Sequence, residues 1–161
     1  MYKALTCVVI AGASIGFLVP GGHGSSAPPK PATRTAQGYA VPVETRIHRS
    51  QSGHFFVDAV VNGQPVHFVV DTGATDVVLT VEDAQRIGLD IDPSKFDVIG
   101  QGVSGPARGQ MLRFSSVELD GKERLDVAGA VVEGGDMSLL GQSYLSRLNS
   151  VQMNGEEMIL R

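Results

Sequence analysis

The stretch that decides the fold of this chain reads Phe68-Val69-Val70-Asp71-Thr72-Gly73-Ala74-Thr75-Asp76-Val77-Val78-Leu79. An apolar strand runs into one carboxylate, a glycine allows a tight turn directly after it, and a second apolar run returns the chain to the core. Alone, Asp-Thr-Gly also suits a polar turn between two strands. The apolar residues on both sides favour instead a rigidly mounted acid at Asp71.

A second segment near the C-terminus has a related form. It reads Ser138-Leu139-Leu140-Gly141-Gln142-Ser143-Tyr144-Leu145 and follows another apolar strand at residues 127–132. Between the two segments lies a glycine-rich run at residues 99–109, which suits either a β-hairpin over a binding site or a mobile surface loop. Its position between the two segments favours the hairpin.

Together these segments resemble the retropepsin-like aspartic proteases, and more closely the bacterial, single-domain, membrane-anchored members of that group, over residues 52–161. The resemblance implies an all-β fold with two short helices, built as a small closed acid-protease-type β-barrel with one lobe per chain. It implies a catalytic Asp71, and an active-site loop supported by Thr72, Gly73, Ala74, Leu139, Leu140 and Gly141. It also implies a flap that closes over substrate, for which the candidates are Gly102, Val103, Ser104 and Gly105. Asp76 suits a turn or a solvent-facing position, and it is also close enough to Asp71 in the sequence to contact the substrate backbone.

The implied chemistry needs two carboxylates about 3 Å apart that share one proton, because like charges this close cannot both ionise. One oxygen then activates a water while the protonated carboxyl donates toward the scissile carbonyl. The chain contains one Asp-Thr-Gly and no Asp-Ser-Gly. We therefore expect a homodimer in which two copies of Asp71 meet at the two-fold axis. The expected activity is that of an aspartic endopeptidase acting on extended polypeptide segments. The alternative is a peptide-binding or assembly module of the same fold without turnover.

Two departures from the family pattern bear on activity. Retroviral members pair an acidic residue, two positions after the motif glycine, with an arginine directly after the later glycine. Here Thr75 and Gln142 stand at those positions, so both halves are absent and no orphan charge remains. Ala74 has no hydroxyl to donate to the carboxylate, whereas pepsin-like enzymes usually have Ser or Thr there. We therefore expect activity nearer neutral pH. Candidate side chains for substrate pockets are Phe55, Phe56, Met111 and Met137.

Length and composition agree with a single domain, and no cofactor is expected. The chain has 161 residues, 42% of them hydrophobic, and a formal net charge of −4, which suits a single core and gives nucleic acid no electrostatic foothold. The four histidines show no zinc-ligand spacing with one another or with Cys7, so no metal is expected. Cys7 is the only cysteine, so the domain needs no disulfide.

The N-terminal region differs in composition from the rest, which predicts three parts: a signal anchor or signal peptide at 1–22, a flexible Gly/Ser/Pro-rich tether at 23–43, and the protease domain at 44–161. Residues 4–19 carry no charge and follow Lys3, although a membrane span wants about 20 residues. The small-residue pattern at 25–27 is followed by Pro28, which disfavours cleavage. We therefore expect a retained anchor in a bacterial inner membrane, with the domain in the periplasm.

Turn signals predict three β-hairpins, at 54–61 with 65–70, at 116–119 with 124–132, and at 151–153 with 158–160. Their turns are Asn-Gly or Asp-Gly pairs, the residues that two-residue hairpin loops prefer. A capping-box pattern from Thr80 to Asp83 predicts a short helix ending near Leu89, and a second helix is expected at 142–148.

Overall fold

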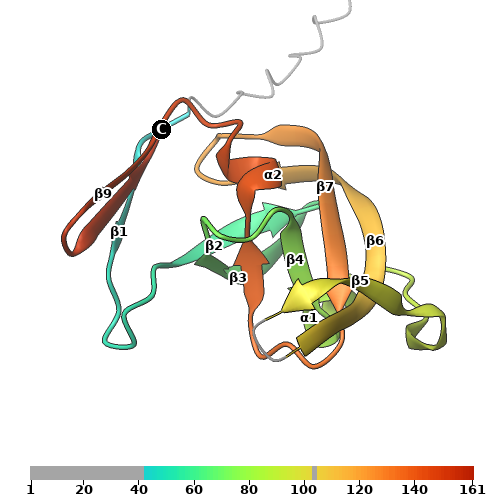
Figure 1. Cartoon of the computed structure of the whole chain (residues 1–161). Coiled ribbons are helices and arrows are strands. Elements are labelled where there is room, and N and C mark those ends of the chain that lie inside the picture. The colour runs from blue at the N-terminus through green and yellow to red at the C-terminus, as the bar shows by residue number, and fades with distance from the viewer. Residues whose placement is uncertain (1–41, 103–104) are drawn as a thin grey trace, which may run out of the picture. The chain divides into compact units, whose positions relative to one another are not determined.

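The structure, a computed structural model, describes residues 42–102 and 105–161. Within these ranges strands predominate and the helices are short (Figure 1). In chain order the elements are β1 (Thr45–His48), β2 (Phe56–Val61), β3 (Gln64–Val70), β4 (Val77–Thr80), α1 (Val81–Arg86), a 3-10 turn (Pro93–Lys95), β5 (Asp97–Gly102), β6 (Gly105–Glu118), β7 (Arg124–Val132), β8 (Ser138–Leu140), α2 (Gln142–Leu145), β9 (Val151–Asn154) and β10 (Glu157–Leu160).

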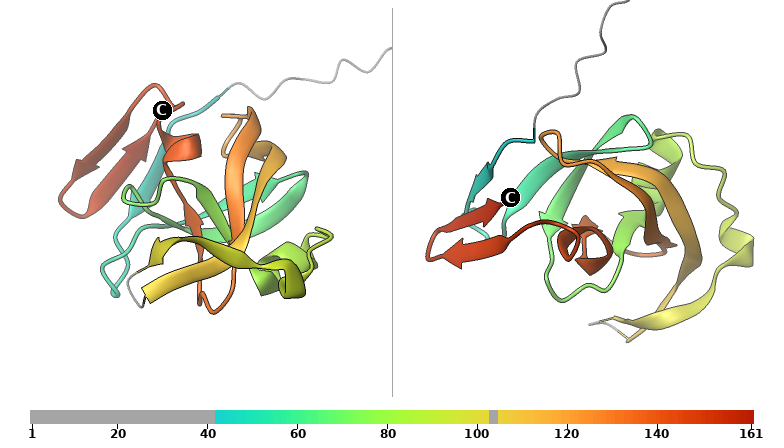
Figure 2. Two further views of the ribbon diagram at one scale, coloured as in Figure 1. Left: turned by 45° about the vertical axis from the view of Figure 1, so that its right-hand side comes forward. Right: turned by 90° about the horizontal axis from the view of Figure 1, so that it is seen from above.

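The main sheet closes on itself as a barrel. Its strand order is β2-β3-β8-β4-β7-β6-β5, and an additional pairing joins β2 to the end of β6 through Val60 with Glu118 and Val61 with Val117. Six strands thus complete the ring, and β5 extends outward in a hairpin with the first half of β6. Figure 2 shows the sheet curling back on itself. The predicted all-β class and closed barrel with two short helices are confirmed.

A second, three-stranded sheet has the antiparallel order β1-β10-β9 and lies beside the barrel in Figure 1. Arg49 links the two parts. Its guanidinium lies 4.5 Å above the ring of Phe55 and donates hydrogen bonds to the carbonyl oxygens of Gly53 and Gly155, at 2.9 and 3.0 Å. The Arg49 side chain therefore contacts both the segment that leads into β2 and the β9–β10 turn.

The three predicted hairpins are present as β2–β3, β6–β7 and β9–β10. In the first two, the Asn or Asp of the turn has a positive φ, 50° at Asn62 and 49° at Asp120, as does the glycine after it. This is the geometry for which Asn-Gly and Asp-Gly are selected. Both helices are shorter than expected. α1 ends at Arg86, before Gly88 with φ +80°, and α2 ends at Leu145.

The barrel interior is filled by large apolar side chains from nearly every strand and from both helices. Fully buried members include Phe68, Leu79, Phe114, Leu140, Tyr144 and Leu145. Gly129 faces Phe114 so closely that a Cβ there would lie 2.2 Å from the ring. The Tyr144 hydroxyl donates to the Lys122 carbonyl at 2.7 Å, and burial raises the pKa of this phenol. The interior is thus a packed core, as in other small barrels.

The N-terminal boundary lies slightly earlier than expected. Val43, which the composition assigned to the tether, donates its N–H to the Asp120 carbonyl at 3.1 Å and accepts a hydrogen bond from the Lys122 ammonium at 2.5 Å. Residues 23–41 of the predicted tether and the hydrophobic segment lie outside the described residues. In the part of the chain that the structure covers, no helix is long and apolar enough to cross a membrane.

Candidate active site

Asp71 directly follows Val70, the last residue of β3. β3 runs parallel to β8, with Val70 opposite Leu140, and the Asp71 N–H donates to the Leu140 carbonyl at 3.1 Å. The half-buried side chain turns back, so that Oδ1 accepts a hydrogen bond from the Gly73 N–H at 2.8 Å. A Cβ on Gly73 would lie 3.2 Å from that oxygen, so glycine allows this close approach. The backbone of Asp71 is therefore held by β8, and its carboxylate by the turn.

The segment around Gly141 is packed against the loop that carries Asp71. The N–H groups of Gln142 and Ser143 donate to the carbonyls of Ala74 and Thr75, each at 2.8 Å. Gly141 lies directly against the Asp76 carbonyl. β8 also separates β3 from β4, pairing with both. The structure thus brings together the loop residues 71–76 and the second segment, as the sequence pattern implied.

Two residues of α2 have contacts that sequence reasoning missed. The Gln142 side-chain amide donates to the Thr72 carbonyl at 2.9 Å. The Ser143 hydroxyl accepts from the Val77 N–H at 3.0 Å and donates to the Ala128 carbonyl at 2.7 Å, which ties β4 to β7. From the sequence, Gln142 was singled out only because retroviral members have an arginine at the corresponding position. No sequence signal identified these partners, because all three are backbone groups distant along the chain.

The predicted flap is a real hairpin. β5 and β6 pair antiparallel from Asp97 with Gly109 up to Gly102 with Gly105, and residues 103–104 lie outside the described part. Arg108 fixes its base by donating to the Phe96 carbonyl at 3.0 Å and pairing with Glu133 at 3.2 Å. Substrate contact by Gly102, Val103, Ser104, Gly105 or Asp76 stays a prediction.

The four candidate pocket residues do not share one environment. Phe55 is only 3% exposed and belongs to the core, so its prediction as a substrate contact is wrong. Its neighbour in the sequence, Phe56, stacks on His67 with ring centroids 5.3 Å apart. Met111 and Met137 are about half exposed and remain candidates.

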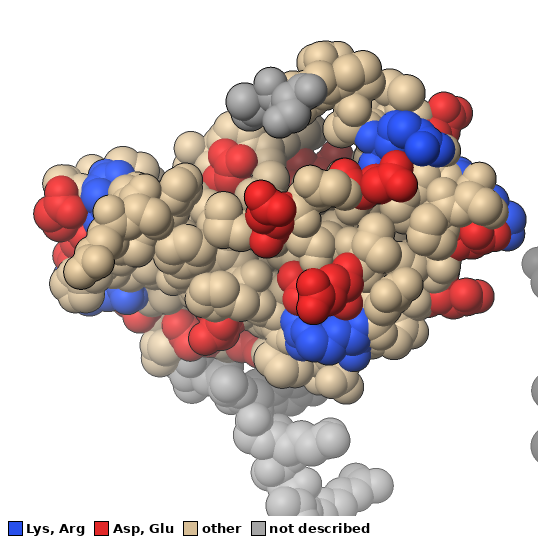
Figure 3. All heavy atoms as spheres, turned by 90° about the horizontal axis from the view of Figure 1, so that it is seen from below, with Lys and Arg blue, Asp and Glu red and all other residues tan. Residues whose placement is uncertain are grey.

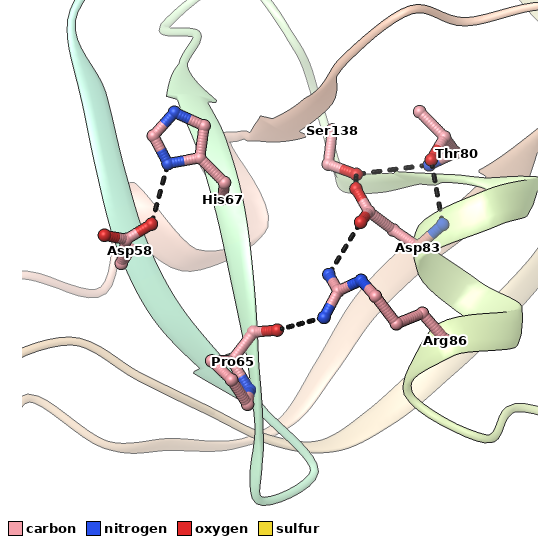
Figure 4. A network of polar contacts seen from close by, with 7 residues as sticks. All are labelled: Asp58, Pro65, His67, Thr80, Asp83, Arg86 and Ser138. Atoms are coloured by element: carbon pink, nitrogen blue, oxygen red, sulfur yellow. Dashed lines mark hydrogen bonds and ion pairs between the residues drawn. The ribbon is translucent and has the colours of Figure 1, made fainter.

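A polar network joins α1 to β8 and to the start of β3 (Figure 4). Asp83 accepts hydrogen bonds from the Ser138 hydroxyl at 2.5 Å and from Arg86 at 2.6 Å, and Arg86 also donates to the Pro65 carbonyl at 2.9 Å. Partial burial acts to raise the pKa of Asp83, but the hydrogen bonds from Ser138 and Arg86 outweigh it and hold the pKa below its usual value. Thr80 caps α1 by accepting from the Asp83 N–H at 3.0 Å.

An open pocket lies beside this network and is lined by Asp58, Pro65, Val66, His67, Asp83 and Arg86. None of these belongs to the loop at 71–76. Among residues 42–102 and 105–161, no three His, Cys, Asp or Glu side chains are grouped to hold a metal ion. On the face shown in Figure 3, acidic and basic side chains stand near one another and much of the described surface is uncharged.

Comparisons with known proteins agree with this geometry. The family described as gag-polyprotein putative aspartyl protease matches residues 57–147. Two curated relatives are the uncharacterized protein RP867 of Rickettsia prowazekii, 37% identical over 118 residues, and an uncharacterized protein from the region 5′ of cobV in a Sinorhizobium species, 35% identical over 120 residues. Each alignment covers 73% of this chain. The matches cover 51% and 52% of those relatives, so the chain spans about half their length.

Among solved structures, the crystal structure of a retropepsin-like aspartic protease from Rickettsia conorii is similar in fold and sequence. The TM-score is 0.64 and the identity 36%, over 73% of this chain and 90% of that one. The family match spans the Asp71 loop, the flap hairpin and Gly141. The chain therefore belongs to the retropepsin-like aspartic protease family.

Proposed function

We propose that this protein is an aspartic endopeptidase that hydrolyses peptide bonds in extended polypeptide segments. The observation that carries the proposal is how Asp71 is held in place. Its carboxylate accepts a hydrogen bond from the Gly73 N–H at 2.8 Å, and its backbone N–H donates to the Leu140 carbonyl of β8. The backbone of Asp71 is thus held by β8 and its carboxylate by the turn. General acid–base catalysis needs such positioning, because the proton must be transferred in one geometry.

The proposed mechanism uses a water and two copies of Asp71. Two carboxyl groups within about 3 Å share one proton, because their like charges cannot both be ionised at that separation. The ionised member takes a proton from water, which attacks the scissile carbonyl carbon while the protonated member donates to the carbonyl oxygen. The tetrahedral diol then collapses: the C–N bond breaks, the carboxyl that took the water proton gives it to the leaving amine nitrogen, and the other carboxylate recovers a proton from a diol hydroxyl, which restores the shared proton. No covalent enzyme intermediate forms. The flap hairpin would cover the peptide and pair with its backbone groups.

A homodimer follows from the count of catalytic groups. The chain contributes one Asp-Thr-Gly, and the mechanism requires two. An isologous two-fold dimer supplies the second from an identical surface. Activity should therefore rise more steeply than linearly with protein concentration wherever the dimer is incompletely formed.

The test is cleavage of a mixed peptide library by the purified chain from pH 4 to 7, at several protein concentrations. Asp71→Asn is the inactive comparison, and Asp90→Asn, at an exposed position, is the matched control. Cleavage that disappears only in Asp71→Asn and depends on dimer concentration supports the proposal. A folded, dimeric wild type that binds peptides but leaves all of them intact contradicts it and supports a peptide-binding module.

We also propose that residues 1–22 anchor the protein in a bacterial inner membrane with the domain in the periplasm. The support is the uncharged run at residues 4–19 that follows Lys3. In cells, the chain should remain in membranes after alkaline extraction, and its domain should be digested when protease is added to spheroplasts. Recovery of the intact chain in the soluble fraction would contradict the anchor.

A further inference from the structure

The peptide group between Thr72 and Gly73 is hydrogen-bonded at both ends. Its N–H, on Gly73, donates to Asp71 Oδ1 at 2.8 Å. Its carbonyl, on Thr72, accepts from the Gln142 side-chain amide at 2.9 Å. One side chain is therefore connected to the candidate catalytic carboxylate through a single planar peptide.

We propose that Gln142 is a positioning residue for the reaction, holding the peptide between Thr72 and Gly73 so that the Gly73 N–H points at Asp71. This inference rests on the proposed function and adds to it a residue that makes no contact with the carboxylate itself. A peptide unit is rigid and planar, so a bond that fixes its carbonyl also fixes its N–H on the opposite side. Successive hydrogen bonds through one amide also polarise each other and strengthen.

Three other carbonyl groups in this loop are held differently. Those of Asp71, Ala74 and Thr75 accept backbone N–H groups, from Ala74, Gln142 and Ser143. Such bonds are present whatever the side chains are. The Thr72 carbonyl is held by a side chain, so its orientation depends on which residue occupies position 142. Retroviral members have an arginine at this position that pairs with an acidic residue. In this chain Gln142 occupies the position and its side chain contacts the Thr72 carbonyl instead.

The attachment of α2 to the loop does not depend on the Gln142 side chain. The backbone N–H groups of Gln142 and Ser143 and the close contact at Gly141 remain when that side chain is changed. Gln142 is also only half-buried, so its replacement leaves no closed cavity. A variant at this position should fold, which separates a positioning effect from a loss of structure.

The experiment compares Gln142→Met, which keeps length but removes the donor, with Gln142→Arg, which keeps an N–H donor. The matched control is Gln85→Met, an exposed glutamine on α1. We expect Gln142→Met to lower kcat by between about 10-fold and 100-fold with KM unchanged, since small misplacements of reacting groups cost this much. Gln142→Arg should recover most of the loss, and Gln85→Met should match the wild type.

A second measurement does not need activity. In NMR spectra of the full chain, the Gly73 amide proton should exchange faster with solvent and move upfield in Gln142→Met, and return toward the wild-type position in Gln142→Arg. An unchanged Gly73 amide in Gln142→Met overturns the proposal, as does an unchanged kcat. If the wild type cleaves nothing, the proposed function fails, whereas a Gly73 amide that follows the donor at position 142 still supports the positional coupling.

Discussion

Gly141 lies so close to the Asp76 carbonyl oxygen that a Cβ at position 141 would stand 2.1 Å from it, with the Ala74 carbonyl at 2.8 Å. Both neighbours are backbone atoms of the loop that carries Asp71, and neither can rotate away. The glycine of the second segment is therefore required by space. Its φ, −98°, is one that any residue can adopt.

Gly141→Ala is expected to push the loop at 71–76 away from α2. The cost should reach or exceed the upper end of the roughly 1–3 kcal/mol typical of overpacking, because backbone must move. Urea unfolding of the variant measures it. Gly100→Ala is the matched control, because a Cβ there meets nothing within 4 Å. Equal stability of the two variants would contradict the packing argument.

Ala74→Ser adds a hydroxyl one turn after Asp71, at a position fixed by the hydrogen bonds of Ala74 N–H to Asp71 and of its carbonyl to Gln142. A donor to the ionised carboxylate favours the charged form. The acidic limb of the pH–rate profile should therefore move to lower pH. Ala74→Cys, similar in size with a weaker donor, should move it less. A profile identical to the wild type in Ala74→Ser would reject this explanation.

Asp83→Asn tests the network that joins α1 to β8. The pKa of Asp83 is lower in the folded protein than in the unfolded chain, so its stabilising effect is fully present above the unfolded value of about 3.9 and is lost as pH falls through the folded value. The variant should be less stable than the wild type at pH 7, and the difference should shrink toward pH 3. Denaturant unfolding across this range measures it. Asp90→Asn, exposed, serves as the control, and a difference independent of pH would contradict the linkage.

Lys122→Met tests how the N-terminal edge of the domain is held. Lys122 is 3% exposed, and its ammonium donates to the Val43 carbonyl at 2.5 Å and to the Thr45 hydroxyl at 2.8 Å. Removing it takes a donor from the buried Thr45 hydroxyl, at about 1–3 kcal/mol for such a group, and also releases the carbonyl of the exposed Val43. Hydrogen exchange of β1 should accelerate.

The control for this prediction is Lys95→Met, at a lysine whose side chain is 77% exposed and whose ion pair with Asp92 lies at the surface. An exposed pair of this kind contributes little to stability, with a median of about 0–1 kcal/mol. β1 should exchange in this variant as it does in the wild type. Equal acceleration in both variants would show that Lys122 has no special part.

Local signals were sufficient for much of the fold. The Asn-Gly and Asp-Gly turns located three hairpins, because a two-residue loop determines which strands pair. The N-cap at Thr80 located α1. By contrast, β1 was not predicted, since its partner β10 lies more than a hundred residues away and no local pattern records that pairing. β5 was expected only as part of the flap, because its exposed, glycine-containing sequence has no buried face.

Some residues of the candidate site could likewise be found from local sequence, and others could not. Asp71, Gly73 and Gly141 could be found from the sequence, because a turn that presents a carboxylate and a close backbone crossing each restrict the residue type. Phe55 was misjudged as a pocket residue, since an aromatic side chain is equally suited to a pocket and to a core. Gln142 was singled out only because retroviral members have arginine there, and its contact with the Thr72 carbonyl was not predicted.

By itself, the sequence determined the strands of the three hairpins, their turns, the start of α1 and the glycine after Asp71, because each depends on the conformations that a few neighbouring residues can adopt. The tertiary structure alone decided the closure of β2 on β6, the core position of Phe55, and the contact of Gln142 with the Thr72 carbonyl. These three features depend on contacts between residues that are far apart along the chain. A backbone carbonyl is also the same acceptor in every residue, so the sequence does not indicate which carbonyl the Gln142 amide contacts. Only the packing of β3, β8 and α2 selects which carbonyl that amide meets.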